Sequence, residues 1–104
     1  MKIKMTIEKT EQDGHVTLKL NGWLDTVSAP ALGAAVDEIG TAAAIILDFE
    51  GVEYIASSGL RQVVACNRKA KELDAAFSLV RVGTEAMNIF RLTGLDKKLD
   101  ITAK

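Results

Sequence analysis

The chain has 104 residues, which is enough for one ordinary domain and too few for two independent cores. Hydrophobic residues make up 48% and charged residues 26%, a composition typical of folded rather than disordered chains. With 13 basic and 14 acidic residues the formal charge is −1, and no apolar run approaches a bilayer-spanning length, so we expect neither a nucleic-acid partner nor membrane insertion.

The first 20 residues predict a β-hairpin. Ile3, Met5 and Ile7 alternate with polar residues, as expected of a half-buried strand. Asp13-Gly14 is a hairpin turn signal, and apolar residues alternate again over residues 15–20. We therefore expect an antiparallel second strand with a polar face.

A connection and a helix are expected next. Residues 22–26 form the connection, Ser28 is placed to cap a helix, and Pro30 suits the first turn because its missing N–H is not needed there. Apolar residues recur at helical spacing over 32–39, and Gly40 ends the run.

The middle of the chain predicts a buried strand followed by a longer helix. Residues 44–47 are apolar without alternation, which favours a parallel strand covered on both faces. We expect residues 48–56 to form a loop and a helix to begin at Gly59. The apolar stripe of that helix consists of Leu60, Val63, Cys66, Ala70 and Leu73.

The last third predicts a strand over 77–82, a helix capped by Thr84 and ended near Gly94, and a short strand over 99–101. In the helix, Met87 and Phe90 are expected in the core. The order β-β-α-β-α-β-α-β, with right-handed crossovers, gives an α/β fold with a mixed sheet, in one domain spanning 1–104.

Two adjacent serines precede the predicted helix that begins at Gly59. The first N–H groups of a helix have no intrahelical partner and carry partial positive charge, so such a site stabilises a phosphate. A serine at this place, Ser57 or Ser58, is therefore a candidate phosphate acceptor. From the spacing alone a plain helix cap is the commoner role for serine at this position, and both interpretations remain open.

Four short motifs, in this order and spacing, resemble the STAS domain, and more closely the bacterial anti-sigma factor antagonists of the SpoIIAA type. The resemblance extends from Val16 to Ile101. The motifs are Gly22-Trp23-Leu24-Asp25, Ile46-Leu47-Asp48-Phe49, the run from Val52 to Arg61, and Leu92-Thr93-Gly94-Leu95.

The resemblance implies a non-enzymatic binding protein with helices packed mainly on one side of its sheet. The N-terminus lacks the continuous apolar stretch of a signal peptide, so we expect a cytoplasmic protein, and we expect no cofactor or metal. Its partner would be an anti-sigma factor that is also a serine kinase. Phosphorylation of one serine would end the interaction, and a phosphatase would restore it. The position that matches the family's acceptor is Ser57. The implied partner surface consists of Asp25, Ser58, Gly59, Leu60 and Arg61.

Ala56 departs from the family pattern, since many members have aspartate there. Loss of the carboxylate removes a contact to the kinase or its magnesium, and it also removes a like charge beside the future phosphate, so the two effects oppose each other. A second function stays open: similar stand-alone STAS proteins are accessory subunits of lipid-transport ATPase complexes, in which Ser57 would not be phosphorylated. A small serine hydrolase is a third, but the chain lacks a Gly-x-Ser-x-Gly elbow.

The remaining candidate residues each have a simpler interpretation. Asp25 contacts a partner or caps N–H groups in its own turn. Trp23 is an interface anchor or, as we favour, a lid on the core. Arg61 pairs with a phosphate or is a solvated arginine, the commoner case.

Isolated chemistry-bearing residues point to no catalytic or metal site. His15 has no nucleophile and orienting acid near it in sequence. The single cysteine, Cys66, excludes an internal disulfide and resembles a small buried hydrophobe. We expect the acidic residues Asp48, Glu50 and Glu53 to lie in a solvated loop rather than to bind magnesium.

Overall fold

In the computed structural model, which describes residues 5–104, five strands form one mixed sheet in the order β1-β2-β3-β4-β5. The β1–β2 pair is antiparallel and the other three pairs are parallel. The elements in chain order are β1 (Thr6–Gln12), β2 (His15–Leu24), α1 (Ala29–Asp37), β3 (Ala44–Ile55), α2 (Ser57–Glu72), β4 (Ala76–Val82), α3 (Thr84–Leu92), the short 3-10 helix η1 (Leu95–Lys97) and β5 (Asp100–Ala103). The predicted α/β order is thus confirmed, with η1 as an addition, while Ile3 lies outside the described residues.

The N-terminal hairpin forms where the sequence predicts it. Asp13 and Gly14 have φ angles of 53° and 80°, so both turn residues are left-handed, as a two-residue hairpin turn of matching twist requires. In β2 the side chains of Val16, Leu18 and Leu20 are buried, and the polar residues between them face the other way.

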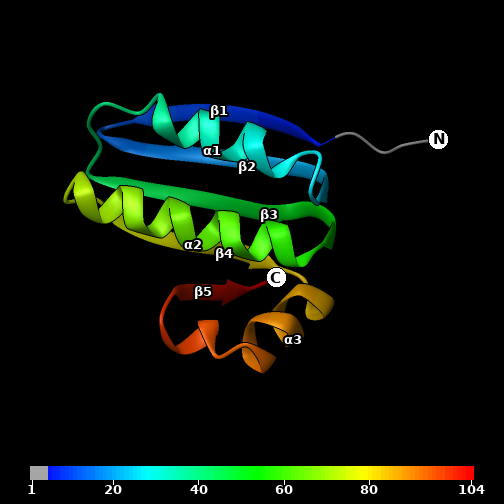
Figure 1. The fold of residues 1–104 in the computed structure, drawn as a ribbon. Helices are drawn as coiled ribbons and strands as arrows, with labels where there is room; N and C mark the ends of the chain where they lie inside the picture. The colour runs from blue at the N-terminus through cyan, green and yellow to red at the C-terminus, as the bar shows by residue number, and fades with distance from the viewer. Residues whose placement is uncertain (1–4) are drawn as a thin grey trace.

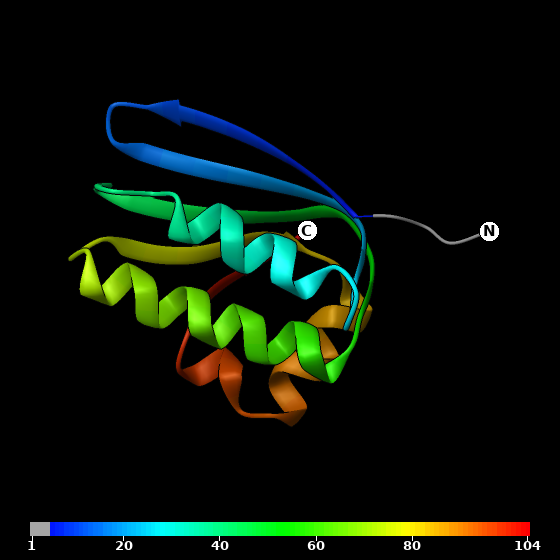
Figure 2. The same cartoon turned by 45° about the horizontal axis from the view of Figure 1, so that its top comes forward.

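The helices cover one face of the sheet (Figure 1), and the turned view in Figure 2 shows α1 and α2 side by side beneath the strands. The core lies between these layers. Phe49 of β3 and Phe90 of α3 meet there edge to face, with ring centroids 6.1 Å apart. Met87 and Phe90 are both buried, which confirms their predicted place in the core.

The opposite face of the sheet is open, and this corrects one prediction. Ile45 and Leu47 are fully buried beneath the helices, but Ile46 between them points to the open face and is half-buried. The parallel pairing of this strand was predicted correctly, and its burial on both faces was not. An isoleucine on an open face is shielded by its cross-strand neighbours, so the apolar run does not require a second layer.

Two strands are longer than the sequence predicts. β2 continues through Leu24, and β3 continues to Ile55, so most of the expected connection at 22–26 and the expected loop at 48–56 are strand. The pairing register of β2 and β3 shifts between Lys19 and Asn21 and again between Gly22 and Trp23. At both shifts the extra residue lies in β3, so the period-2 pattern of that strand is interrupted and residues 48–56 suggested a loop.

The helix boundaries also differ in detail. α2 begins at Ser57, two residues before the predicted start, and Gly83 rather than Thr84 occupies the N-cap of α3. Gly94, at φ 77°, follows the end of α3 as predicted. None of the helices within 5–104 combines the length and the apolar character of a membrane-spanning segment.

The apolar stripe of α2 is confirmed at its centre. Val63, Cys66 and Ala70 are buried, whereas Leu60 and Leu73 are only half-buried although both pack against the core.

Candidate functional site

The N-terminus of α2 lies where the parallel strands β2 and β3 end, and two contacts fix it there. The backbone N–H of Ala56 donates to the carbonyl of Leu24, at 2.9 Å. Gly59 is buried in the first turn, where a Cβ atom would come within 2.6 Å of that same carbonyl oxygen and 3.0 Å of Cγ1 of Ile55. Only glycine allows the helix to approach the strand ends this closely.

No side chain caps this helix. Ala56 occupies the N-cap position with extended φ and ψ of −96° and 171°, and it has no group that could accept a hydrogen bond from the first turn. Ser57 is the first helical residue rather than the cap, so the plain-cap interpretation of this serine is wrong. Ser57 is exposed, and its hydroxyl has no hydrogen-bond partner within the described part of the chain.

The neighbouring serine has a different environment. Ser58 is half-buried, and its hydroxyl lies 3.1 Å from the hydroxyl of Thr26 in the loop after β2. This contact joins two segments 32 residues apart, and no sequence pattern predicted it. The structure therefore separates the two serines, one exposed at the helix start and one engaged with the loop.

Asp25 organises that loop. Its carboxylate Oδ1 accepts hydrogen bonds from the backbone N–H groups of Val27 and Ser28, at 3.0 and 3.1 Å. The Ser28 hydroxyl in turn accepts a hydrogen bond from the backbone N–H of Asp25, at 2.9 Å. Ser28 occupies the N-cap position of α1, but its side chain makes no capping hydrogen bond to that helix. The turn-capping role of Asp25 is thus confirmed, and it places the 25–28 loop next to α2.

Two more predicted residues of the partner surface, Leu60 and Arg61, lie on the same helix, and Leu60 is half-buried against the core. Arg61 is exposed and stands four residues after Ser57, so the two side chains share one helix face. The structure therefore brings Asp25, Ser58, Gly59 and Arg61 together around Ser57. Gly59 itself is buried, and its role is to let the helix backbone lie close to the strand ends.

The unfilled cap predicts a stabilising substitution. Replacing Ala56 with aspartate supplies an acceptor for the first-turn N–H groups and a negative charge at the positive end of the helix. We expect Ala56→Asp to raise the free energy of unfolding by about 0.5–2 kcal/mol, measured by urea denaturation. Ala34→Asp, on the exposed side of α1, is the control, and no gain at position 56 relative to it would contradict the described cap geometry.

Trp23 and Tyr54 form an exposed aromatic pair on the open face of the sheet. They are cross-strand neighbours of β2 and β3 with ring centroids 5.4 Å apart. Trp23 is 40% exposed and Tyr54 51% exposed, so the prediction that Trp23 forms a lid on the core is wrong. The alternation of β2 is unbroken, so Trp23, next to the buried Leu24, faces the open side.

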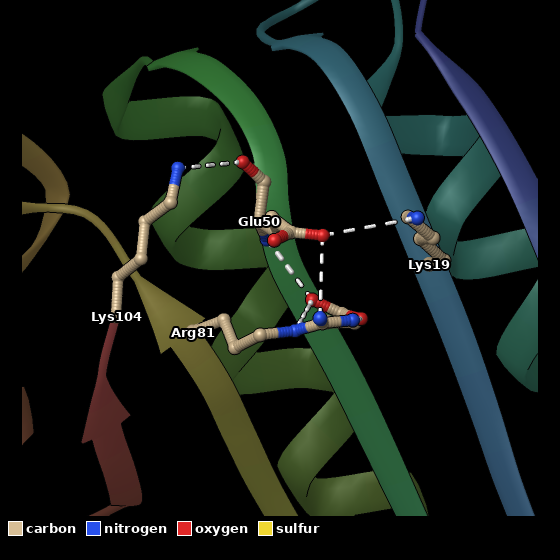
Figure 3. Close-up of polar contacts among 5 residues, drawn as sticks. Lys19, Glu50, Arg81 and Lys104 are labelled. Carbon is tan, nitrogen blue, oxygen red and sulfur yellow. Dashed lines mark hydrogen bonds and ion pairs between the residues drawn. The ribbon is translucent and has the colours of Figure 1, made fainter.

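The same face carries a cluster of charges (Figure 3), of which Asp48 and Glu50 were predicted to lie in a solvated loop. Asp48 is buried and paired with Arg81, whose Nε donates to Oδ1 at 3.1 Å and whose Nη2 meets Oδ2. Glu50 Oε1 lies 3.3 Å from Nη1 of Arg81 and 3.8 Å from Nζ of Lys19. Lys104 donates to the Glu50 carbonyl at 3.3 Å. The cluster ties β2, β3, β4 and the C-terminus together.

Arg81 reaches this position through an unusual backbone conformation. Its φ of 54° lies in the left-handed region, which costs an ordinary residue about 1–3 kcal/mol. The residue sits where the β4–β5 register shifts between Leu79 and Val82. In this conformation the guanidinium of Arg81 reaches the Asp48 carboxylate.

The charge cluster makes stability depend on pH. Burial alone would raise the pKa of the Asp48 carboxyl, but hydrogen bonds from Arg81 and the Glu50 N–H, with the charges of Arg81 and Lys19, hold it below its ordinary value. Because the folded form has the lower pKa, the carboxylate stabilises the fold above the unfolded pKa of about 3.9 and loses this contribution as the pH falls through the folded pKa.

We expect Asp48→Asn to lower the free energy of unfolding by about 1–3 kcal/mol at pH 7, because the hydrogen bonds to a charged group are lost. The difference from the unsubstituted chain should shrink as the pH falls below about 4. Urea denaturation at several pH values measures both effects. Asp100→Asn, at an exposed carboxylate on β5, is the control, and a pH-independent difference at position 48 would exclude the described role.

The other chemistry-bearing residues lie away from Ser57. His15 is the first residue of β2, while α2 begins beside the last, so a Ser57–His15 catalytic pair is excluded by about 30 Å of strand. Burial raises the pKa of the Cys66 thiol to about 11, which keeps it protonated and unreactive at neutral pH. Within residues 5–104, no three His, Cys, Asp or Glu side chains are grouped to hold a metal ion.

Comparisons with known proteins show to which proteins the chain is similar. A family model described as "Mlab, STAS domain" matches residues 7–102. The anti-sigma-F factor antagonist RsfB of Mycobacterium tuberculosis is 28% identical over 95 residues, covering 89% of this chain and 77% of that protein. The anti-sigma-B factor antagonist of Bacillus subtilis is 26% identical over 105 residues, covering 100% and 94%. The crystal structure of an anti-sigma factor antagonist from Mycobacterium paratuberculosis superimposes with a TM-score of 0.87 at 28% identity, covering 97% of this chain and 87% of the other.

Proposed function

The chain belongs to the STAS domain family, and we propose that it is an anti-sigma factor antagonist whose binding is ended by phosphorylation of Ser57. The relatives named above are anti-sigma factor antagonists, which supports the general function. The proposed partner is an anti-sigma factor with serine kinase activity, and a phosphatase resets the chain. In this function the chain binds and is modified, and it catalyses no reaction itself.

The observation that carries the choice of residue is the contrast between the two serines. Ser57 is exposed at the first position of a helix with no side-chain cap, so a kinase can reach its hydroxyl. Ser58 is half-buried and engaged with Thr26. Ser57 also stands two residues before Gly59, as the acceptor does in the family motif.

A phosphate on Ser57 fits the unmodified backbone. The N–H groups of the first turn and the helix dipole stabilise the dianion, which adds about −1.5 to −2 charge at neutral pH. Arg61, one turn along the same face, is within reach of a phosphate on residue 57. The modified form is therefore stable, while a partner that packs on this surface meets a bulky new charge.

Mass spectrometry tests the proposal. The chain is captured from its native cell, and its intact mass, its phosphopeptides and the co-captured proteins are measured together. We expect phosphate on Ser57 and a kinase-like anti-sigma factor as the main partner. In the matched assay with that purified kinase and Mg-ATP, Ser57→Ala should abolish labelling and Ser58→Ala should retain it. If the Ser57→Ala variant is still phosphorylated, the phosphate acceptor is another residue.

Ala56 is the observation that favours a second function, the accessory subunit of a lipid-transport ATPase complex. An alanine beside the acceptor gives a kinase no carboxylate to contact. In that function the same α2 surface docks on the ATPase and Ser57 stays unmodified. A transporter ATPase as the main captured protein, with no phosphate on residue 57, would support this function over the first.

A further inference from the structure

A groove of about 450 Å³ lies beside the proposed phosphorylation site, between the end of β3 and the first turns of α3. The apolar part of its lining comes from two segments far apart in the sequence. Val52 and Ile55 belong to β3, and Ala86 and Ile89 belong to α3. Most of the surface that the groove presents is therefore apolar, which suits an apolar side chain of a binding partner.

The groove carries negative charge that the described residues do not neutralise. Glu53 and Glu85 both line it and are exposed. No lysine or arginine in the range 5–104 forms an ion pair with either carboxylate. Glu85 lies in the first turn of α3, whose N-terminal end also lines the groove and stabilises negative charge there, but no side-chain cation among the described residues is paired with Glu53. The charge complementary to this groove is positive.

The groove is also continuous with surfaces already described. Tyr54 forms part of its wall and contacts the exposed Trp23, so an aromatic patch borders it. Ile55 lines it and is followed directly by Ala56 and Ser57. Tryptophan and tyrosine are among the residues that contribute most to the binding energy of protein interfaces. A lysine or arginine also binds favourably over the face of a tyrosine ring.

We propose that this groove binds a segment of the partner protein in which a lysine or arginine is flanked by apolar side chains. The apolar side chains contact Val52 and Ile89, and the cation lies between Glu53 and Glu85. The inference rests on the proposed function, because the occupant belongs to the partner that also covers Ser57. It adds a second contact region that phosphorylation does not modify.

Two peptides test the groove without knowledge of the partner. The isotope-labelled full chain is titrated by NMR with acetyl-Leu-Arg-Leu-amide and with acetyl-Leu-Glu-Leu-amide, at up to about millimolar concentrations because short peptides bind weakly. We expect the arginine peptide to shift the amide signals of Glu53, Tyr54 and Ala86. The glutamate peptide should not, and neither should the arginine peptide added to Glu53→Gln/Glu85→Gln. Equal shifts with both peptides, or none with either, overturn the proposal.

The anti-sigma factor identified as above provides the second measurement. Glu53→Gln/Glu85→Gln should weaken its binding to the unphosphorylated chain tenfold or more, while Glu72→Gln, at the exposed far end of α2, should leave it unchanged. Binding of the double variant at the unsubstituted affinity overturns the groove and leaves the proposed function intact. If the unsubstituted chain itself does not bind, the function fails, and the peptide titration alone decides whether the groove takes a basic segment.

Discussion

Replacing Ser57 with aspartate is expected to weaken binding to the anti-sigma factor about 100-fold or more. Placing an unpaired, desolvated charge in an interface commonly costs several kcal/mol, and about 2.7 kcal/mol suffices for this change in affinity. The fold should be unaffected, because the side chain is exposed and a carboxylate is favourable in the first turn of a helix. Calorimetric titration gives the affinity, and thermal unfolding gives the stability.

Ser57→Ala is the matched control, since it removes the hydroxyl without adding charge. It should bind within a few-fold of the unsubstituted chain, and its melting temperature should be nearly the same. Unsubstituted affinity in Ser57→Asp would exclude phosphorylation of this residue as a switch. A large fall in melting temperature would instead show that residue 57 is not exposed at the helix start.

We expect Gly59→Ala to lower the free energy of unfolding by about 2 kcal/mol in net terms. Alanine is ordinarily the better helix former by about 1 kcal/mol, so the substitution would stabilise most helices. Here the added Cβ would lie 2.6 Å from the Leu24 carbonyl oxygen, an atom of the strand backbone that cannot rotate away. The first turn of α2 must therefore move off the strand ends, and the proposed partner surface around Ser57 moves with it.

Gly40→Ala is the control for this prediction. Gly40 is exposed after α1, and a Cβ there would meet no atom within 4 Å. Urea denaturation should show a lower midpoint for the Gly59 variant and a stability within about 0.5 kcal/mol of the unsubstituted value for the Gly40 variant. A stabilised Gly59→Ala protein would mean that α2 and the strand ends are further apart than described.

The sequence predicted the order of the elements because each has a local cause. Asp13-Gly14 fixes the hairpin, Pro30 fits the start of α1, and Gly94 ends α3, so these boundaries depend only on neighbouring residues. The resemblance to the STAS family further predicted that the helices pack mainly on one side of the sheet, and the open opposite face agrees with this prediction. The apolar run at 44–47 alone led to the opposite expectation.

The errors share one physical origin, which is that bulges and distant contacts are not visible in a local pattern. Gly51 pairs with Asn21 at a register shift, and beyond it the alternation of β3 is broken, so the strand end was predicted as a loop. Asp48 looked like a solvated carboxylate because its partner, Arg81, is 33 residues away. Thr26 was missed for the same reason, since its contact with Ser58 crosses between two segments.

At the candidate site, the sequence located the residues but could not assign their roles. It named Ser57 and Asp25 and left two interpretations open for each. The cap geometry decided against the plain cap for Ser57, and the hydrogen bonds from Val27 and Ser28 established the turn-forming role of Asp25. These outcomes depend on which atoms a side chain reaches, which is a property of the folded chain.

One consequence for signalling follows from the hydrogen bond between Ala56 and Leu24 and from the close packing of Gly59 against the Leu24 carbonyl. They anchor the first turn of α2 to the sheet, so the proposed phosphorylation of Ser57 would act without moving the helix. A switch of this kind responds without the delay of a structural rearrangement. Its response to the degree of phosphorylation also lacks the sigmoidal steepness of a concerted conformational transition. Under the proposed function, the pool of molecules that can bind the partner then falls in direct proportion to the fraction phosphorylated at Ser57.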